Sequence, residues 1–406
     1  MSEVKNVPEI RFAEFTNAWE QRKLEECFKI RNEKNGDRYT REDVLAVSDT
    51  YGCVNQIEFH GRSFAGEDIS NYKIVRKGDI IYTKSPLQAK PYGIIKIVGN
   101  ETGIISPLYV VNEAVDNIDS MYMYYLFDTP ERTNNYLCPL VRKGAKNTMN
   151  ISNDEWLSGE VTISPDKQEQ QLIGTFFRHL DNLITLHQRK HDKLAVLKKA
   201  MLEKMFPQNG SNVPEIRFAG FTDPWEQRKV GDITVESSEY ANLEAGYPLL
   251  TSSRAGLMYQ NEYRGNLTTN SKETLFSVVP IGACTYRHMS DDDVFHLNVN
   301  ALEKGLVSRE YPVFFASEGT RLDFIVQYIN SSVSFRAFCA EQKKGGTRTR
   351  LYYNALCEFK MMVPSQREQD AIADFFLKLD NLITFQQRKS ESLKHIKAAL
   401  LQKMFV

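Results

Sequence analysis

The sequence predicts an α+β protein that is built twice, with two similar α/β domains joined by a pair of long antiparallel coiled-coil helices in a pseudo-two-fold cyclic arrangement. Residues 6–23 carry a tryptophan-containing phrase that returns almost letter for letter at residues 212–229. A helix-like segment at residues 169–190 returns in the same way at residues 368–389. A repeat of about 200 residues is far longer than the unit of a stacked-repeat protein, so the copies indicate a duplicated module of one domain and one helix.

The first domain is expected at residues 1–164, and the stretch after the phrase is rich in β-forming residues. Short β-branched runs at residues 72–85, 92–99 and 104–113 are broken by glycine, proline or asparagine, which is typical of short strands separated by turns. Residues 121–137 have the composition of a helix. The block therefore predicts a curved sheet accompanied by one helix.

The first long helix is expected at residues 165–206 and the second at residues 365–406. Side chains recur in both at alternating steps of three and four, which is the pattern of a coiled-coil seam. The expected seam consists of Phe176, Leu180, Leu183, His187, Lys190, Leu194, Leu197 and Met201 in the first helix and of Phe375, Leu379, Leu382, Gln386, Lys389, Leu393, Ile396 and Leu400 in the second. Because an unpaired apolar seam is unstable in water, the helices are expected to pair antiparallel, with their polar positions meeting near the middle. An ordinary core-facing helix is the alternative, and the length and the duplication count against it.

The second domain is expected at residues 207–364. It has little overall similarity to the first domain, yet a strand-like run at residues 305–313 takes the place of residues 103–111. Small insertions account for the changing spacing, because surface loops tolerate changes in length. The two domains are therefore expected to share a fold and to differ in their surfaces. By the same repeat, residues 6–23 should pack against the end of the second helix, as residues 212–229 follow the end of the first.

The composition is that of a globular protein: of 406 residues, 42% are hydrophobic and 25% are charged, and the net charge is −1. Six cysteines are scattered without metal-binding spacing, which predicts free thiols in a reducing compartment. The N-terminal residues lack the apolar core of a secretion signal, and no segment has the apolar length of a membrane span, so a cytoplasmic location without membrane contact is expected. A net charge near zero argues against wrapping nucleic acid without regard to sequence, although local basic patches still bind phosphate.

Catalytic motifs are absent from the sequence. It contains no phosphate-binding loop, no dinucleotide-binding glycine motif, no zinc-protease helix motif, no nucleophile elbow and no Asn/Asp-Pro-Pro-aromatic tetrapeptide of amino-methyltransferases. His187 and His191 stand one helical turn apart, but no third metal ligand accompanies them. We therefore expect no catalytic residue, no metal site and no cofactor in this chain.

Basic residues near glycine and tyrosine are the functional signal that remains. Arginine, lysine, asparagine and glutamine contact base edges and phosphates in duplex DNA. Two such clusters fall at equivalent places in the two domains, after a central strand-like run and in a loop before each long helix. Solvated loops have the same composition. Because the clusters recur in two diverged copies, we favour DNA binding as their function. The predicted DNA-binding residues are Lys84, Ser85, Lys90, Tyr92, Lys143, Lys146 and Asn147 in the first domain, within a basic stretch that also holds Lys73, Arg76 and Lys96, and Arg287, His288, Lys343, Lys344, Arg348 and Arg350 in the second.

The repeated phrase PEIRFxxFTxxWEQRK, the helices that begin with Glu-Gln and run to Lys-Met-Phe, and the alternation of variable blocks with constant helices resemble the specificity subunit of a type I restriction-modification system. The resemblance covers essentially the whole chain. It implies that each variable block is a target recognition domain for one half of a split double-stranded DNA sequence, and that the paired helices space these domains and dock two methyltransferase subunits. Methylation and cleavage, with S-adenosylmethionine, ATP and Mg²⁺, would belong to the methyltransferase and restriction subunits.

Members of such a family differ most in their variable blocks, so the resemblance transfers no base-contacting residue to this sequence. A second hypothesis is a coiled-coil scaffold whose two flanking domains bind protein partners. The two basic, glycine-containing loops count against it. A stand-alone DNA methylase or nuclease is a third hypothesis, and the absence of nucleotide and S-adenosylmethionine motifs counts against that one.

Overall fold

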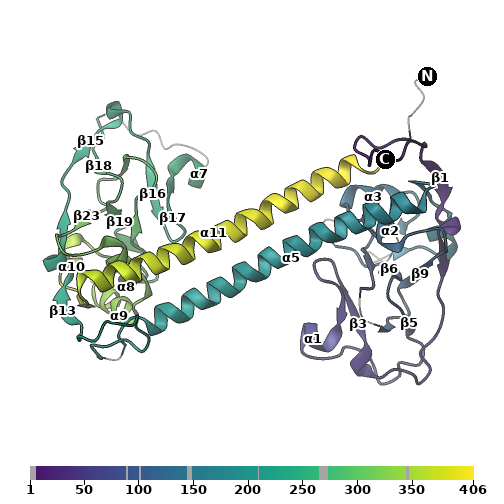
Figure 1. Cartoon of the computed structure of the whole chain (residues 1–406), viewed down its shortest axis with the longest axis horizontal. Helices are drawn as coiled ribbons and strands as arrows, with labels where there is room; N and C mark the ends of the chain where they lie inside the picture. Colours follow the sequence, from purple (N-terminus) through teal and green to yellow (C-terminus); the bar gives the residue numbers. More distant parts are fainter. Residues whose placement is uncertain are drawn as a thin grey trace. The chain divides into compact units, whose positions relative to one another are not determined.

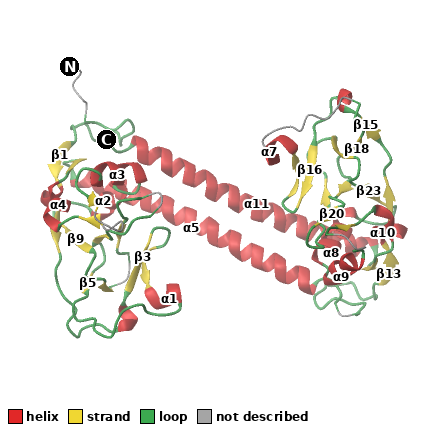
Figure 2. Cartoon of the chain, turned by 180° about the vertical axis from the view of Figure 1, so that it is seen from behind, coloured by secondary structure: helices red, strands yellow, loops and turns green. Residues whose placement is uncertain are grey.

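The computed structural model describes residues 6–87, 90–99, 102–143, 149–208, 210–264, 273–343 and 347–406. The chain divides into two compact units, one formed by Met1–Gln188 with Gln387–Val406 and the other by Arg189–Gln386. Each unit contains one domain of strands and helices and half of each long helix, α5 (Lys167–Lys204) and α11 (Gln366–Lys403) (Figures 1 and 2). The units are thus divided within the long helices, and the domain boundaries predicted at the helix ends stay predictions.

The first unit is built around a four-stranded antiparallel sheet. Its strands follow in the order β2 (Phe28–Ile30), β9 (Val110–Ala114), β6 (Ile80–Tyr82) and β7 (Ile95–Ile97). Antiparallel pairs beside it are β1 (Glu20–Lys23) with β12 (Glu160–Ile163), β3 (Leu45–Ser48) with β4 (Gly52–Asn55), β5 (Lys73–Val75) with β8 (Gly103–Ile105), and β10 (Arg142–Lys143) with β11 (Met149–Asn150). The three strand runs predicted from the sequence coincide with β5 to β9.

The segment predicted as one helix, residues 121–137, forms two helices, α2 (Ser120–Leu126) and α3 (Pro130–Leu137). Pro130 has no backbone N–H to continue a helix, and the hydroxyl of Thr129 accepts the N–H of Arg132 at 3.3 Å, which starts a new one. The domain also contains α1 (Gln56–His60), α4 (Asn153–Ser158) and short 3-10 helices at Leu24–Glu26 and Arg41–Asp43.

The second unit repeats this architecture. Its four-stranded antiparallel sheet has the order β14 (Thr234–Glu236), β23 (Val313–Ala316), β19 (Cys284–Thr285) and β21 (Asn298–Val299). Val313 lies opposite Thr285 in this sheet, as Val110 lies opposite Tyr82 in the first, so the central strands have equivalent registers. The predicted common fold of the two domains is therefore confirmed.

The other elements of the second domain follow the same plan. Three further pairs of strands are β13 (Glu226–Lys229) with β25 (Lys360–Val363), β16 (Leu250–Ser253) with β17 (Gly256–Tyr259), and β20 (Met289–Ser290) with β24 (Thr349–Arg350). One sheet contains β15 (Tyr240–Ala241), β18 (Phe276–Val279) and β22 (Gly305–Ser308). Its helices are α6 (Val230–Ile233), α7 (Gln260–Arg264), α8 (Leu322–Ser331), α9 (Val333–Glu341) and α10 (Tyr353–Cys357), with a 3-10 helix at Leu243–Ala245.

Each copy of the repeated phrase joins the end of one long helix to the start of the other. In the second unit the N–H of Ile216 donates to the carbonyl of Lys204, near the end of α5, at 2.9 Å. In the first unit the N–H of Ile10 donates in the same way to the carbonyl of Lys403, near the end of α11, at 3.0 Å. The N-terminal copy of the phrase thus contacts the end of α11, which lies at the other end of the sequence. The predicted cyclic order is therefore confirmed.

The same phrase neutralises a buried carboxylate at the start of a helix. Arg11 Nη2 lies 2.9 Å from Glu169 Oε2 of α5, and Trp19 Nε1 donates to the same oxygen at 3.2 Å. In the second unit Arg217 Nε lies 2.7 Å from Glu368 Oε1 of α11. A buried carboxylate is stable only when it is paired and hydrogen-bonded. This requirement explains why the phrase and the helix start recur together.

The two helices run antiparallel within each unit. In the first unit the rings of Phe177 and Phe405 have centroids 6.0 Å apart, and Asp181 lies further along α5 while its partner Lys397 lies further back along α11. His187 and Gln386 fall at the junction between the units. The predicted polar layer there stays a prediction.

Part of the predicted seam is displaced by one residue. The positions Leu180, Leu194, Leu379 and Leu393 face inward as predicted, whereas Leu183, Leu197, Leu382 and Ile396 are 41–47% exposed. The half-buried residues in their place are Ile184, Lys198, Ile383 and Lys397. The two lysines do not fit a pattern of apolar residues. They lie in the seam because each forms an ion pair with a carboxylate on the facing helix. Lys397 Nζ is 2.8 Å from Asp181 Oδ1, and Lys198 Nζ is 2.6 Å from Asp380 Oδ1.

Candidate nucleic-acid interface

The basic stretch of the first domain is largely used for internal contacts. Lys90 Nζ lies 2.7 Å from Asp49 Oδ1, and Lys96 Nζ lies 3.2 Å from the same oxygen, with both lysines buried. Lys73 Nζ donates to the carbonyl of Tyr109 at 2.8 Å. A buried ammonium held by a carboxylate is not available to a phosphate on the surface. The prediction that Lys90 contacts DNA is therefore wrong.

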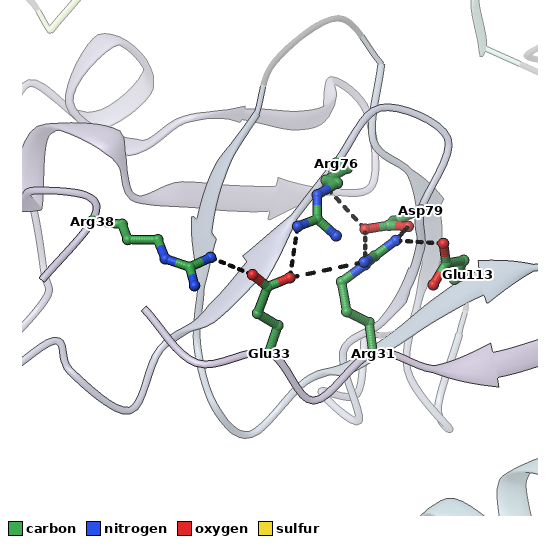
Figure 3. A network of polar contacts seen from close by, with 6 residues as sticks. All are labelled: Arg31, Glu33, Arg38, Arg76, Asp79 and Glu113. Atoms are coloured by element: carbon green, nitrogen blue, oxygen red, sulfur yellow. Dashed lines mark hydrogen bonds and ion pairs between the residues drawn. The ribbon is translucent and has the colours of Figure 1, made fainter. Parts of the chain in front are cut away.

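Arg76 belongs to a second internal network (Figure 3). Its members are Arg31, Glu33, Arg38, Arg76, Asp79 and Glu113. Arg31 Nε lies 3.0 Å from Asp79 Oδ2, and Arg76 Nη2 lies 2.7 Å from Glu33 Oε2. Burial raises the pKa of Asp79 despite its arginine partner. The network ties the segment after β2 to the turn before β6, and its role is structural.

The end of β6 keeps part of the predicted polar set at the surface. Ser85 is exposed, whereas Lys84 is half-buried and donates from Nζ to the carbonyl of Ile151 at 2.7 Å. Burial lowers the pKa of Lys84. Its φ of 55° lies in the left-handed region, which is uncommon for a residue other than glycine. Tyr92 is half-buried, and its hydroxyl lies 3.4 Å from Cys138 Sγ.

The glycine-containing loops before the long helices are described only in part. Lys146, Asn147 and Lys344 lie outside the described residues, and so does the side chain of Lys143, whose backbone forms β10. Their predicted DNA contacts stay predictions. The geometry of the candidate surface can therefore be described more fully in the second domain.

In that domain the predicted cations gather around the two-stranded ribbon of β20 and β24, in which Met289 lies opposite Arg350. Arg348 and Arg350 line a cleft of 740 Å³ on the ribbon. Arg287 lines a second cleft of 590 Å³ that also contains Asp291. Lys343, Arg287, Arg348 and Arg350 are exposed. The two clefts share Met289 of the ribbon in their lining, so residues from separate parts of the sequence lie near one ribbon.

His288 is buried and supports the surface from beneath. Only 3% of it is exposed, and its ring stacks on Tyr352 with centroids 5.5 Å apart and an interplanar angle of 24°. Its Nε2 lies 3.3 Å from Glu310 Oε2, and burial lowers the pKa of the imidazole. The prediction that His288 contacts DNA directly is wrong, because Tyr352 and the ribbon cover it. Its neighbour Arg287 is the exposed residue at this position.

Three residues that the sequence analysis missed line the larger cleft: Gln342, Tyr352 and Asn354. None of them is basic, so positive charge did not mark them in the sequence. Amide side chains pair with adenine in the major groove, and tyrosine offers both a ring and a hydroxyl. Their proximity to the basic loop in the sequence was the available signal.

Two carboxylates hold neighbouring arginines in place. Arg348 Nε lies 2.7 Å from Asp291 Oδ1, and Arg254 forms an ion pair with Asp292. The hydrogen bond from Arg254 lowers the pKa of Asp292 to about 2. Both pairs are exposed, so their contribution to stability is small.

Neither a metal centre nor a membrane span is found in the described residues. Across the described ranges no group of three or more histidine, cysteine, aspartate and glutamate side chains is placed to hold a metal ion. No helix in the same part of the chain has the length and apolar character to cross a membrane. The described cysteines are all free thiols.

The chain matches the model of a known protein family. The model of the type I restriction modification DNA specificity domain matches residues 17–196 and 306–395, which together are more than half of the chain. These residues reach into both domains and both long helices.

Relatives of full length are similar at low identity. A Methanocaldococcus jannaschii protein assigned as the MjaX type I restriction enzyme specificity subunit is 20% identical over 424 residues, covering 98% of this chain and 95% of the relative. The crystal structure of a type I restriction-modification S subunit from M. genitalium is similar with a TM-score of 0.57 at 13% identity, covering 98% and 99% of the two chains. The HsdS subunit of Thermoanaerobacter tengcongensis has a TM-score of 0.44 at 15% identity, covering 95% and 96%.

Proposed function

This chain belongs to the type I restriction-modification DNA specificity family, and on that premise we propose that it selects the double-stranded DNA sequence on which a restriction-modification complex acts. The specificity family is non-catalytic. The chemistry is proposed to reside in methyltransferase and restriction subunits that use S-adenosylmethionine, ATP and Mg²⁺.

Each domain is proposed to read one half of a two-part target. The observation that carries this proposal is a shared fold with different side chains at equivalent positions. Two residues after the equivalent central strand positions Tyr82 and Thr285, the first domain has the half-buried Lys84 and the second has the exposed Arg287. Because base recognition depends on individual side chains in a groove, two such surfaces favour two different half-sites.

The long helices are proposed to dock the partner subunits. In the first unit Leu183 and Leu186 are 44% and 45% exposed, and their counterparts in the second unit, Leu382 and Phe385, are 47% and 50% exposed. Exposed apolar side chains grouped on a helix are typical of protein-binding surfaces. Because the set occurs once in each unit, we propose that two methyltransferase subunits dock, one on each, and that restriction subunits join this complex.

Exchange of one domain tests the proposal. Residues 24–164 are replaced by the corresponding block of another specificity subunit, the hybrid is combined with its methyltransferase partners, and the methylated bases are mapped. One half of the recognised sequence should change while the other half stays the same. The reciprocal control replaces residues 230–364 and should change the other half. A hybrid that altered both halves together would contradict the two-module proposal.

A further inference from the structure

Arg350 is the exposed residue between two buried neighbours on β24. Thr349 is 1% exposed and its hydroxyl donates to the carboxylate of Asp293, while Leu351 is fully buried and its N–H donates to the carbonyl of His288 at 2.8 Å. Successive residues of a strand point to opposite faces. The buried neighbours therefore fix the strand and direct Arg350 outward from the core.

The cleft beside Arg350 has the charge and polarity of a nucleic-acid surface. Its described lining consists of Met289, Gln342, Thr347, Arg348, Arg350, Tyr352, Asn354 and Ala355, and none of these described residues is acidic. The cleft beside Arg287 differs, because Asp291 and Asp292 line it together with Arg254 and Arg287, so that its carboxylates offset the charge of its arginines. Charge therefore favours the cleft of Arg350 for DNA.

Of the two arginines that line this cleft, Arg350 is the one whose donors are available. Arg348 is bound to Asp291 at 2.7 Å, whereas Arg350 forms no ion pair with any residue that the structure describes. A guanidinium has five N–H donors in a planar fork, which matches two neighbouring acceptors. In duplex DNA the O6 and N7 atoms of guanine present such a pair in the major groove.

We propose that the β20–β24 ribbon enters the major groove and that Arg350 determines specificity by donating two hydrogen bonds to one guanine of the half-site that the second domain reads. A two-stranded ribbon has dimensions that the major groove admits. The inference rests on the proposed function, because it names the base that one of the two domains recognises. It predicts that this half-site contains a guanine.

The test uses the full chain with its methyltransferase partners and a duplex oligonucleotide that carries the mapped target. Each guanine of the second half-site is replaced in turn by 7-deazaguanine, which lacks the N7 acceptor. The unmodified complex should lose affinity at one position. Arg350→Ala should bind the natural target about 10- to 100-fold more weakly, and it should be insensitive to 7-deazaguanine at that same position. Arg350→Lys keeps the charge but not the fork and should show most of the loss.

Arg228→Ala is the matched control, because Arg228 is an exposed arginine on another two-stranded sheet of the domain, β13 with β25. It removes the same charge and should retain sensitivity to 7-deazaguanine. The inference is overturned if the half-site contains no guanine, if Arg350→Ala binds as tightly as the unmodified protein, or if it weakens all duplexes equally as a phosphate contact would. In each of these cases a sequence-specific complex would still uphold the proposed function, whereas a complex without sequence preference would refute that function itself.

Discussion

Lys397 has the most demanding environment among the charged residues of the helix pair. Its ammonium is 2.7 Å from Asp128 Oδ2 and 2.8 Å from Asp181 Oδ1, with the side chain 15% exposed. The ring of Tyr125 lies 5.1 Å away, and its hydroxyl donates to Asp181 at 2.7 Å. Among the described residues, the equivalent Lys198 of the second unit forms an ion pair with one carboxylate, that of Asp380, at 2.6 Å, and its side chain is 24% exposed. The lysine of the first unit thus has more ion-pair partners and is less exposed than its equivalent in the second unit.

Replacement of these lysines by methionine should have unequal effects. Lys397→Met leaves two carboxylates poorly compensated in a buried site, so it should lower the free energy of unfolding by about 3–5 kcal/mol. Lys198→Met removes a more exposed pair and should cost less than about 1 kcal/mol. Urea titrations of both variants, followed by circular dichroism, measure the difference. Equal destabilisation would contradict this account.

Burial of His288 gives the second domain a pH-dependent stability. Because burial lowers the pKa of His288, the folded domain keeps the imidazole neutral at a pH where the unfolded chain, with an ordinary pKa of about 6.5, takes up a proton. The contribution of His288 is therefore complete above about pH 6.5 and is lost as the pH falls toward the lowered pKa. Unfolding free energies measured at about pH 7.5 and about pH 5.5 should fall less in His288→Gln than in the unmodified protein. Parallel losses would rule out this role for His288.

Side-chain type alone did not show which of the predicted DNA-binding residues are exposed. Arg287, Arg348 and Arg350 are exposed near one ribbon, as an interface requires. Lys90 is equally basic but lies in the core, because Asp49 reaches it from a distant part of the sequence. His288 is covered by the ring of Tyr352. Sequence shows which residues carry charge, whereas the fold decides which of them find an internal partner.

At the scale of elements, the repeats and the periodicity predicted the long helices and most strands. The ends of α5 and α11 lie within a few residues of the predicted boundaries. The phase of the seam was wrong by one residue at alternate positions, because hydrophobicity was taken as the mark of a contacting residue. Lys198 and Lys397 contact the facing helix through carboxylates, which leaves Leu197 and Ile396 exposed.

The exposed apolar residues of the helices should therefore serve binding and not folding. Leu183→Gln is expected to leave stability within about 0.5 kcal/mol, because the side chain is already 44% exposed. It should weaken the docking of one methyltransferase subunit, and Leu382→Gln should weaken the other, so that each single variant binds one subunit and the double variant binds none. Native mass measurement of the complexes counts the bound subunits. Lys193→Gln, an exposed polar position of α5, is the control and should bind both.

At the scale of the whole molecule, the repeated phrase makes the two ends of the chain structurally equivalent to its middle. Lys204 Nζ meets Glu215 Oε1 at 2.5 Å in the second unit, and Lys403 Nζ meets Glu9 Oε2 at 3.0 Å in the first. Residues 207–211 connect the partners covalently in the second unit, whereas the first unit holds them by non-covalent contacts. This closure could be predicted because a sequence repeat carries the contacts of one copy over to the other.

A circular permutation tests the closure directly. Phe405 is joined to Asn6 through a copy of residues 207–211, and the chain is opened between residues 209 and 210. Since the new connection copies one that already exists, the permuted chain should keep the helicity, the monomeric mass and the recognised DNA sequence of the original. As a control, opening the chain between residues 111 and 112 interrupts β9, a buried strand at the centre of the first sheet, and should prevent folding. The permuted chain could instead aggregate or lose helicity, as this control should. That result would show that the end of α11 and the first copy of the phrase are not arranged like the end of α5 and the second copy.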